Sequence, residues 1–160
     1  MNNVKLWIKL SAVFILLLII SACSTRRDIQ ITLNQSLVKE SIRIDFVGTS
    51  EVELNRLNEK TFEQYWNHND LDAKNVVYVD FRPFEDSLFK QVTPDNPIWT
   101  IWNDTNCEYI FIAVDMEYPG TPKGMWKSNV YLQSYSWYNF WSDRNLYIAI
   151  NKDNLNISNK

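Results

Sequence analysis

The chain has 160 residues, a formal net charge of −3, 46% hydrophobic residues and 22% charged residues. This length predicts one ordinary domain, and the balance of apolar and charged residues excludes an intrinsically disordered chain. Three scattered glycines and two cysteines exclude a Gly-rich phosphate loop, a disulfide framework and a four-cysteine zinc site, and the negative charge argues against a nucleic-acid partner.

The first 22 residues differ from the rest of the chain. Residues 1–9 carry Lys5 and Lys9 and no acid, and residues 10–22 are an unbroken run of apolar and small residues. This order is typical of a secretory signal peptide that is cleaved from the mature protein. The apolar run is shorter than the ~20 residues that a membrane-spanning helix needs.

The end of this run is a sequence that bacterial lipoproteins share. Ile20-Ser21-Ala22-Cys23 resembles their lipobox, in which a branched apolar residue and two small residues precede a cysteine. The resemblance implies a diacylglyceryl group on the Cys23 sulfur, cleavage between Ala22 and Cys23, and an acylated new amino terminus. Two or three chains anchor a protein almost permanently, because each buried CH₂ contributes about 0.8 kcal/mol. An uncleaved anchor helix, or a plain signal with a chance cysteine, is the alternative.

The residue after the cysteine carries information on the destination. The sorting rule of diderm bacteria retains lipoproteins with Asp at this position in the inner membrane, so Ser24 implies the periplasmic face of the outer membrane. Residues 23–28 are then a lipidated tether, residues 29–152 a single periplasmic β-rich domain, and residues 153–160 a polar tail. We expect no cofactor other than the covalent lipid on Cys23.

Strands dominate the expected structure of the domain. Apolar and polar residues alternate at 29–33 and at 41–47, which is the pattern of strands with one buried face, and Gly48 is expected to end the second. Apolar runs predict further strands at 76–81, 109–114, 130–132 and 146–150. The strand at 76–81 is expected to be buried on both faces at its start. A polar connector is expected at 85–96 and the main irregular loop at 118–128.

Short helices are expected between these strands. Ser50–Glu53 and Thr61–Gln64 have the spacing of a capping box, and Asn96-Pro97 is a helix cap followed by proline at the first helical position. Strands and helices do not alternate regularly, which argues against a parallel doubly wound sheet. The predicted fold class is therefore α+β or mainly β, an antiparallel sheet or β-sandwich with two or three short helices.

Candidate catalytic and metal-binding residues are few. His68, the only histidine, lies close to Asp70 and Asp72, but segments rich in Asn and Asp are common in solvated turns. Calcium prefers more oxygen ligands and a glycine in the turn, so we expect a plain turn and no metal.

Acidic residues provide a second set of candidates. A paired-carboxylate hydrolase could draw on Asp80, Asp115 and Glu117, although nothing in the sequence selects them. Asp80 also belongs to a charged cluster with residues 82–86, for which structural ion pairing of Arg82 is the alternative. Because no coherent catalytic set emerges, we do not expect an enzyme.

The second cysteine is left without a partner once Cys23 carries lipid. Cys107 lies beside the apolar run 109–114, and a free cysteine in such a place behaves as a small apolar residue. We therefore expect Cys107 to be semi-buried and inert, and not a nucleophile or redox partner.

Aromatic residues crowd the segment 126–141. They are too numerous for one face of one short element, so some are expected to point outward, where Trp and Tyr support protein interfaces and sugar stacking. A small aromatic core is the alternative. The candidate partner or ligand surface consists of Trp126, Tyr135, Trp137, Tyr138 and Trp141.

Four segments of the domain together form a further resemblance. They are SIRIDFVG at 41–48, Phe62 with Tyr65-Trp66, the Pro97–Trp102 segment and YIFIAVD at 109–115. In these features the chain resembles small lipoproteins encoded with secretion machines, the type VI lipoprotein component among them. The resemblance implies a compact β-sandwich, tethered to the outer membrane, that recruits an inner-membrane partner through its periplasmic face. Helical turns between the early strands are additional to a simple sandwich, and no partner-binding residue transfers.

Two functions of different classes follow from these features. The first is a non-enzymatic, lipid-anchored periplasmic binding or assembly module, in the manner of a type VI-like secretion component, with the membrane and an envelope protein as its partners. The alternative is a lipoprotein that binds a ligand or cell-wall glycan, and in one version hydrolyses it, through the same aromatics and nearby acids.

Overall fold

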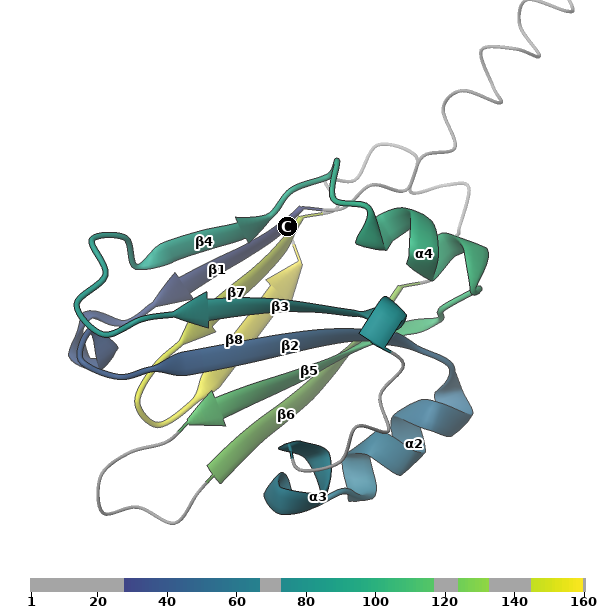
Figure 1. Ribbon diagram of the computed structural model, residues 1–160, viewed down its shortest axis with the longest axis horizontal. Coiled ribbons are helices and arrows are strands. Elements are labelled where there is room, and N and C mark those ends of the chain that lie inside the picture. Colours follow the sequence, from purple (N-terminus) through teal and green to yellow (C-terminus); the bar gives the residue numbers. More distant parts are fainter. Residues whose placement is uncertain (1–27, 67–72, 117–123, 133–144, 160) are drawn as a thin grey trace, which may run out of the picture.

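The computed structural model describes residues 28–66, 73–116, 124–132 and 145–159. These residues form a β-sandwich of two four-stranded sheets (Figure 1), as the sequence predicted. Sheet A has the order β4-β1-β7-β8, and its strands are β1 (Ile29–Leu33), β4 (Phe89–Val92), β7 (Leu146–Ile150) and β8 (Leu155–Asn159). Sheet B has the order β3-β2-β5-β6, with β2 (Ile42–Thr49), β3 (Val76–Phe81), β5 (Tyr109–Met116) and β6 (Gly124–Tyr131).

Short helices join and flank the sheets. The α-helices are α2 (Glu51–Glu59), α3 (Phe62–Trp66) and α4 (Ile98–Asp104), and two 3-10 turns are η1 (Gln35–Leu37) and η2 (Ala73–Asn75). Among the helices of the described ranges, none is both long enough and apolar enough to cross a membrane.

The two ends of the sandwich differ in what they carry. The chain enters β1 at Asp28, whose carbonyl accepts the N–H of Leu146 at 2.8 Å, and β8 finishes at the same end, here called the Asp28 end (Figure 1). The connections β1–β2, β3–β4 and β7–β8 lie at the opposite end, here called the distal end. Strand pairing is antiparallel except between β1 and β7, which run parallel.

The main core fills the space between the sheets. Alternate residues of each strand point inward, as the period of two requires, so Ile29, Ile31 and Leu33 of β1 meet Ile44 and Phe46 of β2 in one buried cluster. Apolar burial contributes roughly 25 cal/mol per Å², and these fully buried side chains therefore account for much of the stability of the fold.

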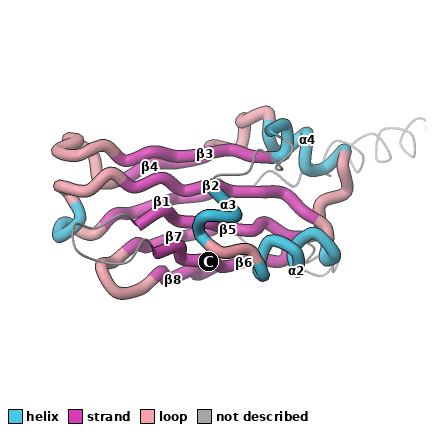
Figure 2. The backbone as a smooth tube through the Cα atoms, turned by 60° about the horizontal axis from the view of Figure 1, so that its bottom comes forward, coloured by secondary structure: helices cyan, strands magenta, loops and turns pink. Residues whose placement is uncertain are grey.

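A second, smaller core lies on the outer face of sheet B. The helices α2 and α3 lie over β2, β5 and β6 there (Figure 2), and Leu54, Leu57 and Tyr65 pack against Val47 and Phe111. In the outward pattern of β2, Asp45 and Val47 are therefore buried beneath the helical layer while Arg43 remains exposed, and the middle of β5 is covered on both faces.

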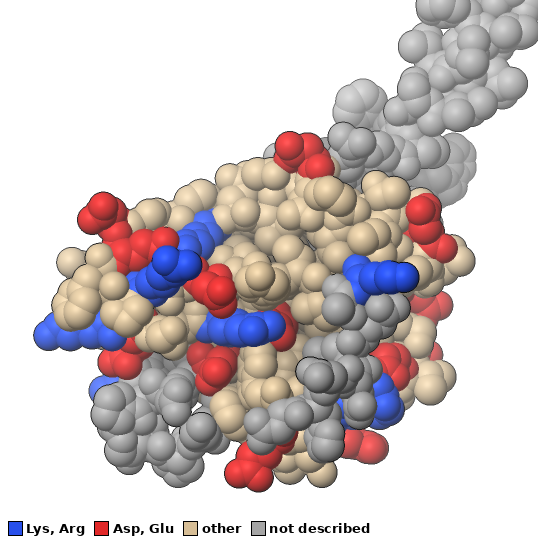
Figure 3. Space-filling view, in the orientation of Figure 1, with Lys and Arg blue, Asp and Glu red and all other residues tan. Residues whose placement is uncertain are grey.

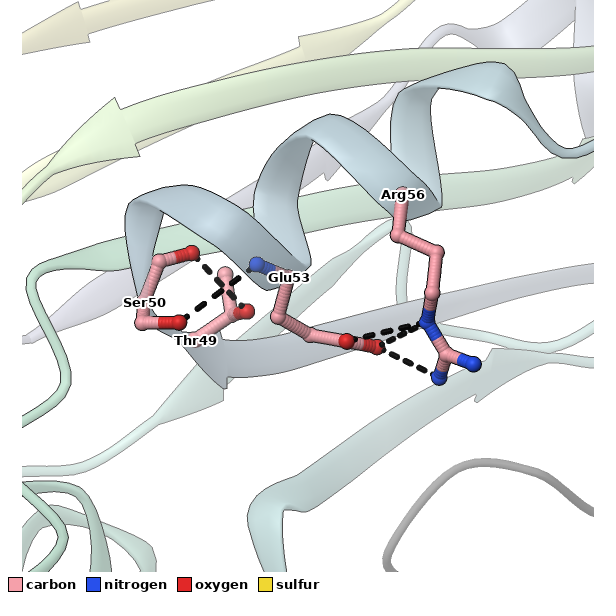
Figure 4. Close-up of polar contacts among 4 residues, drawn as sticks. All are labelled: Thr49, Ser50, Glu53 and Arg56. Carbon is pink, nitrogen blue, oxygen red and sulfur yellow. Dashed lines mark hydrogen bonds and ion pairs between the residues drawn. The ribbon is translucent and has the colours of Figure 1, made fainter.

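Capping interactions begin these two helices where the sequence predicted. The Ser50 hydroxyl accepts the N–H of Glu53 at 3.4 Å (Figure 4), but the Glu53 carboxylate turns to the Arg56 guanidinium at 2.7 Å. The second box is reciprocal, because Thr61 Oγ1 accepts the Gln64 N–H and Gln64 Oε1 accepts the Thr61 N–H.

Helix α4 confirms the third predicted start and packs two tryptophans inward. Asn96 Oδ1 accepts the N–H of Ile98 at 3.0 Å, which caps the helix. The buried indoles of Trp99 and Trp102 meet edge to face at 5.2 Å between ring centroids. Trp102 Nε1 donates to the carbonyl of Asn75 at 2.9 Å and so ties η2 to α4.

Several expected boundaries were wrong. Strand β2 does not end at Gly48, because it continues to Thr49 in register with the start of β5. The expected loop at 118–128 contains the start of β6, since residues 124–128 pair with β5; residues 118–123 lie outside the described ranges.

Two segments that the sequence predicted to be polar and irregular each contain an edge strand. The expected connector at 85–96 contains β4, which pairs with β1, and the expected tail at 153–160 contains β8, which pairs with β7. Strand β3 is not buried on both faces at its start, because it lies at the edge of sheet B and Tyr78 is exposed.

Candidate functional site

A buried carboxylate beneath α3 is the most unusual polar feature of the described domain. Asp45 lies on the outward face of β2 but is only 2% exposed, because α3 covers it. Its Oδ1 accepts the Arg43 Nε–H at 2.8 Å, and its Oδ2 accepts the Tyr65 hydroxyl at 3.4 Å. A charge away from water needs such partners, so this cluster fastens α3 to sheet B.

Two aromatic rings lie against the cation of this cluster, whose side chain is 47% exposed. The Arg43 guanidinium lies 5.4 Å from the Trp66 ring centroid and 4.9 Å from that of Tyr78. Both distances are within the range of cation–π attraction. Arg43 pairs in register with Asp80 of β3 and Asp115 of β5, so acids flank it on both neighbouring strands.

Burial and pairing set the protonation of these groups. Burial raises the pKa of Asp45, although the hydrogen bond and charge of Arg43 oppose this. For Arg43, burial works to lower the pKa, but the bond and charge of Asp45 prevail and raise it. Burial also raises the pKa of Tyr65, so its hydroxyl stays protonated and donates. The cluster can therefore hold a helix in place, and its tyrosine is not poised to act as a base.

The predicted carboxylates lie on either side of this cation. Asp80 and Asp115 stand on the two strands that flank β2, about 9.5 Å apart at the strand spacing, with Arg43 in register between them. The charge of Asp80 helps to raise the pKa of Arg43, and Asp115 shares the register of Arg43 on the other neighbouring strand. Glu117 lies outside the described ranges.

The charged cluster after β3 forms structural pairs at the distal end. Glu85 forms an ion pair with Lys90 at 2.7 Å and accepts the backbone N–H of Arg82 at 3.1 Å. These contacts lower the pKa of Glu85, with Lys90 the larger cause. They bind the turn to the start of β4, and Asp86 follows them in the chain as an exposed residue.

Most of the predicted aromatic surface lies beyond the described ranges. Trp126 lies on β6 and is half-buried against the main core, whereas Tyr135, Trp137, Tyr138 and Trp141 fall within 133–144, which the structure does not describe. That surface remains a prediction.

Exposed apolar side chains occur at places that the sequence did not indicate. The large ones in the described ranges are Val52, Tyr78, Phe84, Phe89 and Tyr131. Phe84 belongs to the β3–β4 connection and Phe89 to the start of β4; Phe89 lies within the segment 85–96, for which the sequence predicted a polar connector. The only sequence signal for a turn at this place is the pair Pro83-Phe84, because proline favours turns.

The remaining sequence candidates divide in the same way. Cys107 is half-buried beside Thr105 Oγ1 at 3.2 Å, and burial raises the pKa of its thiol, as expected of an inert cysteine. Within the described residues no three potential metal ligands come together. The other residues singled out for a site, which lie outside the described ranges, are Ala22, Cys23, His68, Asp70 and Asp72.

Comparison with known proteins identifies related structures but no related sequence. No family model matches the chain, and no curated protein matches it. It is similar to Serratia marcescens Lip, a membrane-bound component of the type VI secretion system, with a TM-score of 0.55 and 13% identity over 84% of this chain and 96% of Lip. It is also similar to the type VI secretion system lipoprotein TssJ1 of Pseudomonas aeruginosa, with a TM-score of 0.53 and 10% identity over 84% of this chain and 95% of TssJ1. At these identities the likeness shows a shared fold.

Proposed function

We propose that this chain is a lipid-anchored, non-enzymatic assembly component of a type VI-like secretion machine. The observation that carries the proposal is the shared sandwich, which spans nearly the full length of two type VI envelope proteins. The lipobox at Ile20–Cys23 would supply a lipid anchor, and one of those proteins, TssJ1, is described as a lipoprotein. The fold and the lipobox thus support the same role independently.

The proposed location is the periplasmic face of the outer membrane, with an inner-membrane protein of the same machine as the partner. The support for the location is Ser24 in place of Asp after the lipidated cysteine. The support for a binding role is that both structural neighbours are named as components of a secretion system. Asp80 and Asp115, the described acids that the sequence offered for hydrolysis, lie in strand register on either side of Arg43.

Two variants test the anchor and the location. With radioactive palmitate, the wild type is expected to be labelled and Cys23→Ser is not; equal labelling would refute lipid attachment at Cys23. In a sucrose gradient of host membranes, the wild type is expected in the outer-membrane fraction. Ser24→Asp should shift it to the inner-membrane fraction, and an unchanged distribution would contradict the proposed sorting.

Co-purification tests the assembly role. The lipidated chain, extracted from host envelopes in mild detergent, is expected to retain an inner-membrane component of the machine, and deletion of the gene should abolish secretion by it. Normal secretion in the deletion strain would overturn the proposal. Trp137→Ala with Trp141→Ala then tests the predicted aromatic surface, because undiminished partner recovery would count against that surface alone.

A further inference from the structure

A phenylalanine at the distal end occupies a position that suits glycine. The Glu85 N–H donates to the Arg82 carbonyl at 3.2 Å, which closes a four-residue turn with Pro83 second and Phe84 third. Phe84 has a φ of 59°, in the left-handed region where Cβ crowds the backbone. Turns with proline second and a left-handed third residue select glycine or asparagine there.

The same residue also exposes an apolar ring. Phe84 is 70% exposed, so most of its phenyl group gains no burial in the isolated domain to offset the strained backbone. The left-handed φ opposes stability, and glycine would relieve it. A strained residue with a largely exposed ring is explained by a contact that the domain makes with something else.

Main-chain and ionic contacts fix the backbone of this turn. The Phe84 N–H donates to the Val38 carbonyl at 2.7 Å, which ties the turn to the β1–β2 connection. On the other side, the ion pair between Glu85 and Lys90 ties it to β4. A residue whose backbone is already fixed loses less conformational freedom on binding, which favours affinity.

The neighbouring strand edges are partly occupied close to the turn. Ser87 Oγ donates to the carbonyl of Phe89 at 2.8 Å and accepts its N–H at 3.2 Å, so both main-chain groups of this edge residue are satisfied. The Lys90 ammonium donates to the Asp80 carbonyl on the edge strand β3. An incoming strand would need such groups, so these positions favour a contact made through side chains.

The place of the turn distinguishes a protein partner from the lipid bilayer. The turn lies at the distal end, whereas residues 1–27 join the sandwich at the Asp28 end (Figure 1). With a lipid on Cys23, the five residues to Asp28 span at most ~18 Å, so the Asp28 end is the one held near the membrane. Around the turn, Lys and Arg alternate with Asp and Glu (Figure 3), and such a mixed surface does not select anionic lipid.

We propose that Phe84 is an anchor that inserts into a ring-sized apolar pocket of a periplasmic protein. Phe89, the exposed first residue of β4 after this connection, adds apolar contact at the rim. The inference rests on the proposed function, because the pocket belongs to the partner that the lipoprotein recruits. Buried aromatic anchors of this kind carry much of the affinity of protein interfaces.

The test separates binding from stability with Phe84→Gly. Urea unfolding of this variant should show an equal or higher midpoint than the wild type, because the strained φ is relieved. Its affinity for the purified periplasmic segment of the co-purifying inner-membrane protein should fall ~30-fold, measured by calorimetry with the lipidated chain in detergent micelles. Val52→Ala, at an 82% exposed apolar residue of the Asp28 end, is the matched control and should bind as the wild type does.

Each other outcome has a definite meaning. If the wild type binds and Phe84→Gly binds equally, the anchor proposal is wrong and the assembly role stands. If the wild type does not bind, the proposed function fails and the anchor proposal fails with it. A lowered unfolding midpoint in Phe84→Gly would make Phe84 structural and overturn the proposal. Dimerisation in ultracentrifugation that Phe84→Gly abolishes would do the same, because it would assign the ring to a second copy of the chain.

Quenching by brominated lipid tests whether Phe84 inserts into the lipid bilayer instead of a protein pocket. A bimane label on Phe84→Cys, in a Cys107→Ser background and in reconstituted vesicles of phosphatidylethanolamine and phosphatidylglycerol, should retain its fluorescence. Strong quenching would place position 84 in the bilayer and overturn the proposal.

Discussion

At the scale of single residues, one glycine decides how closely a helix approaches the sandwich. A Cβ on Gly48 would lie 2.2 Å from Cδ1 of Trp102, far inside van der Waals contact. The indole therefore fills the space that the missing side chain leaves, and its Nε1–H reaches the Asn75 carbonyl. Strand β2 runs through this glycine without a break because both neighbouring residues keep their pairing to β5.

We expect Gly48→Ala to lower the free energy of unfolding by about 3 kcal/mol, the upper part of the range for overpacking, because the indole must shift and lose its hydrogen bond. Urea unfolding of the wild type, Gly48→Ala, Trp102→Ala and the double variant measures this. The double variant should lose less stability than the sum of the single ones; strict additivity would show that the two sites do not collide.

Asp45 is the second residue whose surroundings determine its chemistry. Its folded-state pKa is raised because burial penalises the carboxylate, so the folded chain binds this proton more tightly than the unfolded chain does. The stabilising contribution is then complete below the unfolded pKa and is lost as pH rises through the folded pKa.

Asp45→Asn removes this titration while the amide oxygen can still accept from Arg43 and Tyr65. We therefore expect the free energy of unfolding of the variant, minus that of the wild type, to rise between about pH 3 and about pH 7. Urea unfolding at a series of pH values gives this difference. A difference that is constant or falls over the interval would show that pairing with Arg43 outweighs burial.

At the scale of elements, hydrogen-bonded caps define the helical layer over sheet B. Helix α3 has only five residues, too few to be stable alone, so its existence depends on the reciprocal Thr61–Gln64 cap and on the packing of Tyr65 beneath it.

Thr61→Ala removes the hydroxyl that accepts the Gln64 N–H, and we expect it to cost about 1 kcal/mol of unfolding free energy. Thr61→Ser keeps the hydroxyl, so its free energy of unfolding should stay within about 0.5 kcal/mol of that of the wild type. Chemical denaturation of the three proteins tests the cap, and equal losses in both variants would show that the threonine methyl group, and not the hydroxyl, matters.

Local pattern was sufficient for the elements that bury many apolar residues. The bounds of β1, β3 and β7 coincide with the periodic or apolar runs at 29–33, 76–81 and 146–150. The strands β4 and β8 were missed because an edge strand needs few apolar residues, and its identity is set by the partner strand elsewhere in the chain.

The candidate site was less predictable than the fold for a similar reason. The alternation at 41–47 placed Asp45 on an outward face, but its burial depends on Tyr65, 20 residues later. The pair Pro83-Phe84 indicates a turn but not an exposed ring, because the exposure of Phe84 follows from the φ of that turn and from the edges that surround it.

At the scale of the whole molecule, the two ends of the sandwich differ in what they carry. The Asp28 end receives the chain that carries the proposed lipid anchor, and α4 and the start of α2 lie there. The distal end presents the β3–β4 turn away from that anchor. Under the proposed function, this arrangement would make the domain a short spacer between the membrane and its protein partner.

The parallel pairing of β1 with β7 has a consequence for the time at which the chain can fold. Residues Ile29–Leu33 can pair with Leu146–Ile150 only after those residues are available, because sheet A joins the first strand of the domain to nearly the last. Such a large separation makes closure slow, because a long loop must be ordered before the pairing is gained. A chain that leaves a translocation channel amino terminus first cannot complete this sheet until almost all of it has emerged. If the chain is exported as the proposed function requires, sheet A therefore closes only when export is nearly complete.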